Sequence, residues 1–204
     1  MDSRKKVIVR VAVIIIVTGV WLSFWITAPM PRPQTATVLP APLGLAEFSL
    51  LDQNGDAFSR ASFGDHWNLV LFGFTNCPDI CPLTLQVLAN ARQQMLDAGA
   101  QELPRIVLVS VDPERDTPAI ISQYVGNFGA GVIGVTGELA EVRKLTDGLG
   151  VFFQKTSVDD GYYSVDHSAV VILIDPQSNF HALFSAPHEA ASFEHDLPII
   201  MASQ

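Results

Sequence analysis

Uninterrupted runs of apolar residues are the clearest pattern in the chain. They occur at 69–74, within 105–111 and at 169–174, each followed by a polar or proline-containing stretch. Because apolar and polar residues do not alternate within these runs, we predict strands that are covered on both faces. The remaining predicted strands are shorter and lie at 132–135, 151–153 and 180–184.

Apolar residues recur at helical spacing between these strands. The segment 83–98 shows this best, with leucine or alanine every three or four residues and Gly99 after it. Further helices are predicted at 120–128, 138–149 and, in the tail, 188–201. Strands that alternate with helices, followed by a hairpin through Asp175–Asn179, indicate an α/β fold with a mixed central sheet flanked by helices. Asn54-Gly55 between short apolar pieces predicts a second hairpin turn.

The N-terminal part has a different pattern. Residues 11–28 are free of charge and mostly apolar, and a helix of that length spans about 27 Å, close to a bilayer core. Four basic residues lie within 1–10, so the positive-inside rule predicts a transmembrane anchor at 11–28 with 1–10 in the cytoplasm. A cleaved signal peptide is the alternative, but Thr27-Ala28-Pro29 is a poor cleavage site.

Composition separates the anchor from the rest. Residues 29–42 are rich in proline, threonine and alanine, which predicts an extended linker ahead of a domain at 43–204. Beyond Arg32 the chain carries seven basic and twenty acidic residues, which argues against binding to nucleic acid. We therefore expect a single-pass protein of the bacterial inner membrane with its soluble domain in the periplasm, a compartment that permits disulfides.

The only two cysteines, Cys77 and Cys81, lie where the strand at 69–74 gives way to the helix at 83–98. The positive end of a helix dipole favours a thiolate, so we expect lowered pKa values for both thiols. Their spacing of four places both sulfurs on one face of a helical turn. Such a pair can oxidise to a disulfide, bind a soft metal, or remain as inert buried thiols.

A third ligand would separate metal binding from redox chemistry. His167 immediately precedes the strand at 169–174, and ligands gather around loops at strand ends in α/β sheets. Two thiolates and one imidazole suit copper, whereas a structural zinc site usually has four ligands. An unrelated loop histidine is the alternative. The other four histidines have no special setting in the sequence: His66, His181, His188 and His195.

Three segments together resemble the Sco/SenC family of copper-binding, thioredoxin-like assembly factors. They are Gly73–Pro82 around the cysteines, Val111–Pro118 (sequence VDPERDTP), and Val165–Ser168 around His167. Their order and spacing are similar to those of the family over roughly residues 45–190. The chain departs from typical thioredoxins because three residues separate the cysteines and no proline directly precedes the strand at 169–174.

The resemblance implies a thioredoxin-like fold and one copper ion, as Cu(I) or Cu(II), bound by Cys77, Cys81 and His167. It also implies delivery of copper to the dinuclear centre of cytochrome c oxidase subunit II or to another copper enzyme. Other periplasmic copper chaperones or thioredoxin-like reductases are the expected further partners. Asp112 is expected to lie near the metal and to tune its charge without binding it. Asp166 either orients the ring of His167 or points to solvent.

Three other functions use the same residues. A membrane-tethered thiol–disulfide oxidoreductase would keep the cysteines of the oxidase subunit reduced and would use Cys77 and Cys81 as its redox pair. A peroxiredoxin-like peroxidase needs a threonine and an arginine near the thiolate; Thr75 is present, but no arginine is near in the sequence. A copper sensor or storage protein remains the last alternative.

Overall fold

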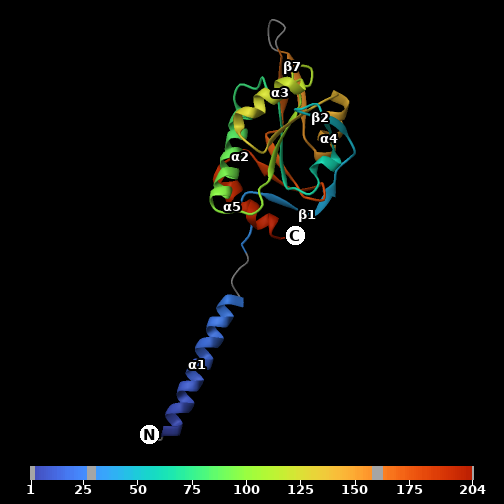
Figure 1. Ribbon diagram of the computed structural model, residues 1–204. Coiled ribbons are helices and arrows are strands. Elements are labelled where there is room, and N and C mark those ends of the chain that lie inside the picture. The colour runs from blue at the N-terminus through green and yellow to red at the C-terminus, as the bar shows by residue number, and fades with distance from the viewer. Residues whose placement is uncertain (1–2, 27–30, 158–162, 204) are drawn as a thin grey trace. The chain divides into compact units, whose positions relative to one another are not determined.

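The computed structural model describes residues 3–26, 31–157 and 163–203, and the chain divides into two units, Met1–Arg32 and Pro33–Gln204 (Figure 1). The first unit contains one helix, α1 (Ser3–Ile26). Within the described ranges, no helix combines the length and the apolar character needed to cross a bilayer. The anchor predicted at 11–28, whose last two residues lie outside the described ranges, stays a prediction.

The second unit is built on a mixed sheet of eight strands. Their order is β1-β10-β9-β4-β5-β6-β2-β3, with β4, β5 and β6 parallel and β9 antiparallel to β4. The bounds are β1 (Thr37–Gly44), β2 (Ser49–Asp52), β3 (Ala57–Ser59), β4 (Asn68–Gly73), β5 (Arg105–Ser110), β6 (Val132–Thr136), β9 (Val170–Ile174) and β10 (Asn179–Ser185). The predicted mixed α/β fold is therefore confirmed.

Helices pack on both faces of this sheet, which explains why its central strands are apolar throughout. In β4, Val70 and Phe72 belong to the core cluster that includes residues of α4, whereas Leu69 and Leu71 belong to the cluster beneath α2, α3 and α5. Figure 1 shows α2 and α5 side by side. The bounds are α2 (Ile80–Asp97), α3 (Pro118–Val125), α4 (Leu139–Leu149) and α5 (Ala190–Met201), with short 3₁₀ turns at Arg60–Phe63 and Gly126–Phe128.

The structure places the strand β1 across the end of the predicted linker at 29–42 and the predicted domain start at 43. The compact unit begins at Pro33, and β1 pairs with β10 at the edge of the sheet. The register of this pairing shifts between Val38 and Leu43, a stretch that contains two prolines. Proline is tolerated on an edge strand because one side of that strand needs no ladder hydrogen bonds. The composition therefore suggested a linker where the chain forms an edge strand.

Two smaller differences bear on the site. Helix α2 begins at Ile80, three residues before the predicted start, so Cys81 lies in its first turn. The pair β7 (Phe153–Ser157) and β8 (Tyr163–His167) forms a separate antiparallel ribbon, which carries His167 at its end. Residues 157–163 contain Asp159-Asp160-Gly161, a polar sequence typical of a turn, but 158–162 lie outside the described residues. The predicted Asn54-Gly55 hairpin is confirmed, since β2 and β3 pair across it.

Candidate metal centre

Three soft or borderline donors meet at one point of the second unit. One atom each of Cys77, Cys81 and His167, a sulfur or a ring nitrogen, lie within 4.8 Å of one another. They come from the loop after β4, the first turn of α2 and the end of β8. The structure therefore brings together the three residues that the sequence singled out, although the histidine lies 86 positions beyond Cys81.

The loop between β4 and α2 sets the positions of the sulfurs. The Cys77 amide donates to the carbonyl of Phe74 at 3.2 Å, and the Cys81 amide lies 3.5 Å from the Cys77 sulfur. Gly73 ends β4 beneath this loop, and a Cβ atom there would lie 2.7 Å from the Cys81 sulfur. Because that distance is shorter than any tolerated contact, Cys81 can occupy this position only above a glycine.

Both cysteines are free thiols, and they differ in exposure. Cys81 is buried and Cys77 is partly exposed. Burial raises the pKa of Cys81, and the hydrogen bond and negative charge of Cys77 act in the same direction. The lowered pKa expected for Cys81 is therefore wrong, because loss of water outweighs the favourable position at a helix start. A bound cation would remove this penalty, since it replaces the proton on sulfur.

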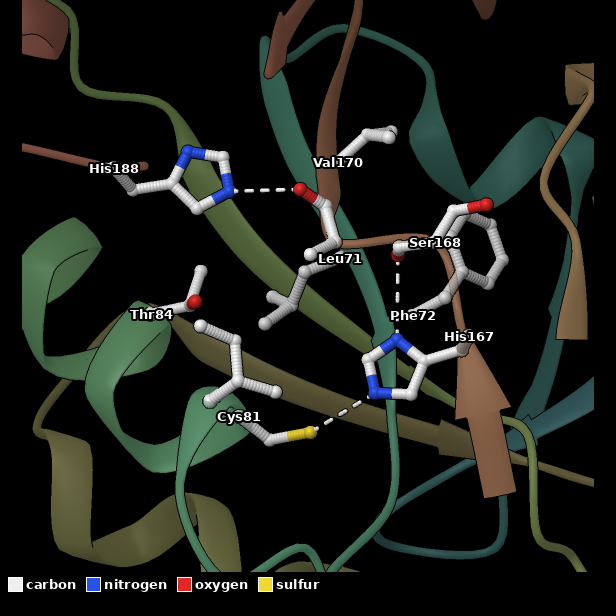
Figure 2. Close-up of a pocket in the computed structure, with 10 residues that line it drawn as sticks. Leu71, Phe72, Cys81, Thr84, His167, Ser168, Val170 and His188 are labelled. Atoms are coloured by element: carbon white, nitrogen blue, oxygen red, sulfur yellow. Dashed lines mark hydrogen bonds between the residues drawn. The ribbon is translucent and has the colours of Figure 1, made fainter. Parts of the chain in front are cut away.

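His167 presents one ring nitrogen to the cysteines. Its Nε2 lies 3.4 Å from the Cys81 sulfur and its Nδ1 lies 3.2 Å from the carbonyl oxygen of Ser168 (Figure 2). Burial lowers the pKa of His167, although the Ser168 carbonyl and the charge of Asp166 oppose that shift. A neutral ring with Nδ1–H on the carbonyl leaves the Nε2 lone pair toward the sulfurs, which is the form that binds metals.

The two acidic residues expected near the metal have different settings. Asp166 is exposed, and its carboxylate accepts a hydrogen bond from the Thr156 hydroxyl at 2.7 Å, so the solvent-facing alternative holds. Asp112 is buried, pairs with Arg115, and accepts a hydrogen bond from the Tyr163 hydroxyl at 2.8 Å. Asp112 therefore fixes Arg115 and Tyr163, which stack on each other with 3.9 Å between guanidinium carbon and ring centroid.

Arg115 links Asp112 to His167 of the donor set through contacts with the Phe74 ring. Its guanidinium carbon lies 5.6 Å from the Phe74 ring centroid. Phe74 in turn meets the His167 ring edge to face, with 6.1 Å between the centroids. Asp112 is thus connected to the imidazole through a cation–π contact and an aromatic pair, and the expectation that it lies near the site without binding metal remains a prediction.

Sequence reasoning missed two residues beside the site. His188 lines the same small cavity as His167 and Cys81, and its Nε2 lies 3.2 Å from the carbonyl oxygen of Ala169 (Figure 2). Asp116 is completely buried and binds Thr75, two residues before Cys77. Asp116 lies in the segment Val111–Pro118 that the sequence singled out, but nothing in the sequence distinguished it from Asp112. No sequence pattern marked His188.

Comparison with known proteins decides the family. A sequence profile described as SCO1/SenC matches residues 39–202, most of the chain. The chain belongs to the SCO1/SenC family. A relative from Stutzerimonas stutzeri, whose name describes it as copper-binding, is 34% identical over 167 residues, which cover 82% of this chain and 81% of the relative.

Solved structures of the SCO1/SenC family share this fold. Arabidopsis thaliana ScoI with copper bound is 33% identical, has a TM-score of 0.74, and is matched over 78% of this chain and 98% of that one. Bradyrhizobium japonicum ScoI with copper bound is also 33% identical, with a TM-score of 0.65 and coverage of 76% and 98%. The thioredoxin-like fold that the resemblance implied is therefore confirmed.

Proposed function

We propose that this SCO1/SenC chain is a copper metallochaperone that binds one copper ion through Cys77, Cys81 and His167. The observation that carries the proposal is the meeting of two sulfurs and one imidazole nitrogen within 4.8 Å. Thiolates favour Cu(I) and the imidazole also accommodates Cu(II), so this donor set fits copper in both oxidation states. The copper-bound structures of related ScoI proteins support the same assignment.

The cargo would pass to the dinuclear copper centre of cytochrome c oxidase subunit II or to another copper enzyme. Family membership supports a role in oxidase assembly. The partial exposure of Cys77 adds a physical reason, because an incoming thiolate of a partner can reach that sulfur before the buried Cys81. Transfer by exchange of one thiolate at a time keeps a soft ion coordinated throughout.

The proposed location is the bacterial inner membrane, with the domain in the periplasm. Its support is the basic residues within 1–10 followed by the uncharged segment 11–28. Fusing a reporter that is active only in the periplasm to the C-terminus of the full chain tests it, with membrane fractionation alongside. If this reporter is inactive, and a second reporter that works only in the cytoplasm is active when fused to the same C-terminus, the proposed orientation is contradicted.

Copper titration of the reduced protein tests the metal site. We expect one tightly bound Cu(I) per chain, and a loss of affinity of about 100-fold in His167→Ala. His66→Ala is the matched control, because His66 is exposed and lies outside the donor set. Unchanged affinity in His167→Ala, or equal losses in both variants, would contradict the three-donor site.

A thiol–disulfide oxidoreductase that reduces the oxidase subunit is the second candidate. The observation in its favour is the pair of free thiols beside one helix start, one partly exposed and one buried, as in enzymes that attack with the outer sulfur. The metal-free protein should then reduce an oxidised subunit II peptide, with its own dithiol becoming a disulfide. Cys77→Ser would abolish this activity, whereas His167→Ala would leave it nearly unchanged while weakening copper binding strongly, so His167→Ala separates the two functions.

A further inference from the structure

Asp116 is a buried acid whose hydrogen bonds converge on the cysteine loop. Its side chain has no exposed surface. One carboxylate oxygen accepts the Thr75 amide at 3.0 Å and the Ser110 hydroxyl at 2.6 Å, and the other accepts the Thr75 hydroxyl at 2.5 Å. Both donor groups of Thr75 are therefore held by the same carboxylate, 41 residues further along the chain.

Hydrogen bonds to the ends of sheet strands fix the position of Asp116. Ser110 is the last residue of β5 and pairs in register with Gly73, the last residue of β4. The backbone carbonyl of Asp116 accepts the hydroxyl of Thr136, the last residue of β6, at 2.6 Å. Asp116 thus joins the ends of two adjacent parallel strands, β5 and β6, to the loop after β4 that carries Cys77, so its position follows from the sheet.

The partners of this carboxylate are all neutral. Thr75 and Ser110 supply the three hydrogen bonds, and no base pairs with Asp116 among the interactions found in the described residues. A buried carboxylate without a cationic partner costs stability. The site therefore carries a negative charge that repels thiolates and that a bound cation would offset.

We propose that Asp116 is a positioning residue of the metal centre, which holds the loop 74–77 in the conformation that places the Cys77 sulfur beside Cys81 and supplies a buried negative charge that favours a bound cation. This inference deepens the proposed function and rests on it for the identity of the ion. Thr75 connects Asp116 to the ligand Cys77. Its amide and hydroxyl both donate to the Asp116 carboxylate, and it lies two residues before Cys77.

Asp116→Asn is the principal variant, because it preserves volume and removes the charge. An amide offers one acceptor oxygen where the carboxylate offers two, so at least one of the three hydrogen bonds from Thr75 and Ser110 is lost or reversed. We expect the Cu(I) affinity to fall about 10- to 100-fold, as for other residues that orient metal ligands. In the metal-free protein, the amides of Thr75 and Cys77 should exchange with solvent faster while those of β4 keep their protection.

Asp196→Asn is the matched control for a buried acid. Asp196 is equally buried and also binds backbone amides and a threonine, but its partners are Gln34, Thr35, Ala36 and the ring of His195 instead of the cysteine loop. It should lower thermal stability and leave Cu(I) affinity within about twofold of the unsubstituted protein. Equal affinity losses in Asp116→Asn and Asp196→Asn would assign the effect to general destabilisation and overturn the proposal.

Thr75 provides a second route if Asp116→Asn does not fold. Thr75→Ser keeps the hydroxyl and should bind Cu(I) like the unsubstituted chain, whereas Thr75→Val removes it and should weaken binding about tenfold. Equal binding by these two variants would overturn the role given to the hydroxyl link. If the unsubstituted chain binds no copper, the proposed function fails, and the exchange rates of the Thr75 and Cys77 amides still decide whether Asp116 positions the loop.

Discussion

The Nε2 atom of His167 lies 3.4 Å from the sulfur of Cys81, although 86 residues separate them in the chain. Two structural arrangements produce this contact. Helix α2 begins directly after the loop from the central strand β4, and the ribbon of β7 and β8 returns a histidine to the same end of the sheet. We therefore expect metal binding to depend on the position of the Cys81 sulfur, and stability to depend on the charge of the His167 ring. We also expect the two thiols to react according to their exposure.

Gly73→Ala should weaken metal binding without touching a ligand. The added Cβ would lie 2.7 Å from the Cys81 sulfur and 3.3 Å from Leu108, so the sulfur must move. We expect a loss of Cu(I) affinity of about tenfold or more and a stability cost of about 1–3 kcal/mol. Gly126→Ala is the control, because a Cβ there meets no atom within 4 Å. Wild-type affinity in Gly73→Ala would show that Cys81 is not confined by β4.

The ring of His167 should titrate below its ordinary value of 6.5 in the metal-free protein, because burial lowers its pKa. The folded chain then binds this proton less readily than the unfolded chain. His167 therefore contributes to stability near neutral pH, and this contribution falls as the pH drops below 6.5 toward the lower folded pKa. Proton NMR of the ring measures the midpoint, and His167→Gln should remove this part of the pH dependence of unfolding. A midpoint above 6.5 would contradict it.

Asp196 should anchor the start of the domain in a pH-dependent way. Burial acts to raise the pKa of Asp196, but hydrogen bonds from His195 and from the amides of Gln34 and Ala36 outweigh it and hold the pKa well below 3.8. Its contribution to stability is therefore complete above about 3.8 and is lost as the pH falls below that value.

We accordingly expect Asp196→Asn to lower the free energy of unfolding by about 2–3 kcal/mol at pH 7, since hydrogen bonds to a charged acceptor are lost. The difference from the unsubstituted chain should shrink as the pH is lowered below 3. Urea unfolding at a series of pH values measures both. A constant difference at all pH values would mean that the charge of Asp196 does not matter.

The two thiols should react at different rates. Cys77 is partly exposed, whereas Cys81 is buried and has a raised pKa, so iodoacetamide should alkylate Cys77 at least about tenfold faster in the reduced, metal-free protein. Mass spectrometry of peptides taken at intervals separates the two sites. Bound Cu(I) should protect both thiols, which are the only two cysteines of the chain. Equal rates would indicate that the loop opens freely.

Local patterns were sufficient to predict the central strands of the sheet and to mark the candidate donors. The run at 69–74 is buried on both faces, and a strand of that kind leads the chain straight to Cys77 and Cys81. His167 was identified from its place before a strong strand. The edge strand β1 was not predicted, because prolines and exposed side chains dominate its composition and only its pairing with β10 reveals it.

Long-range contacts account for what the sequence could not show. Asp116 and Asp112 lie in one acidic segment, and nothing local distinguishes the acid that reaches Thr75 from the one that pairs with Arg115. The raised pKa of Cys81 depends on side chains from distant segments that exclude water, so the helix start alone gave the wrong direction. His188 gained its place beside the cavity only from the packing of the segment before α5.

The three donors come from segments that are complete only when most of the domain has been made. A chain that stops before β8 has the sulfurs without the imidazole, and an unfolded chain offers neither arrangement. Metal would thus bind only to the completed, folded domain. Truncated or unfolded copies of the chain would remain empty.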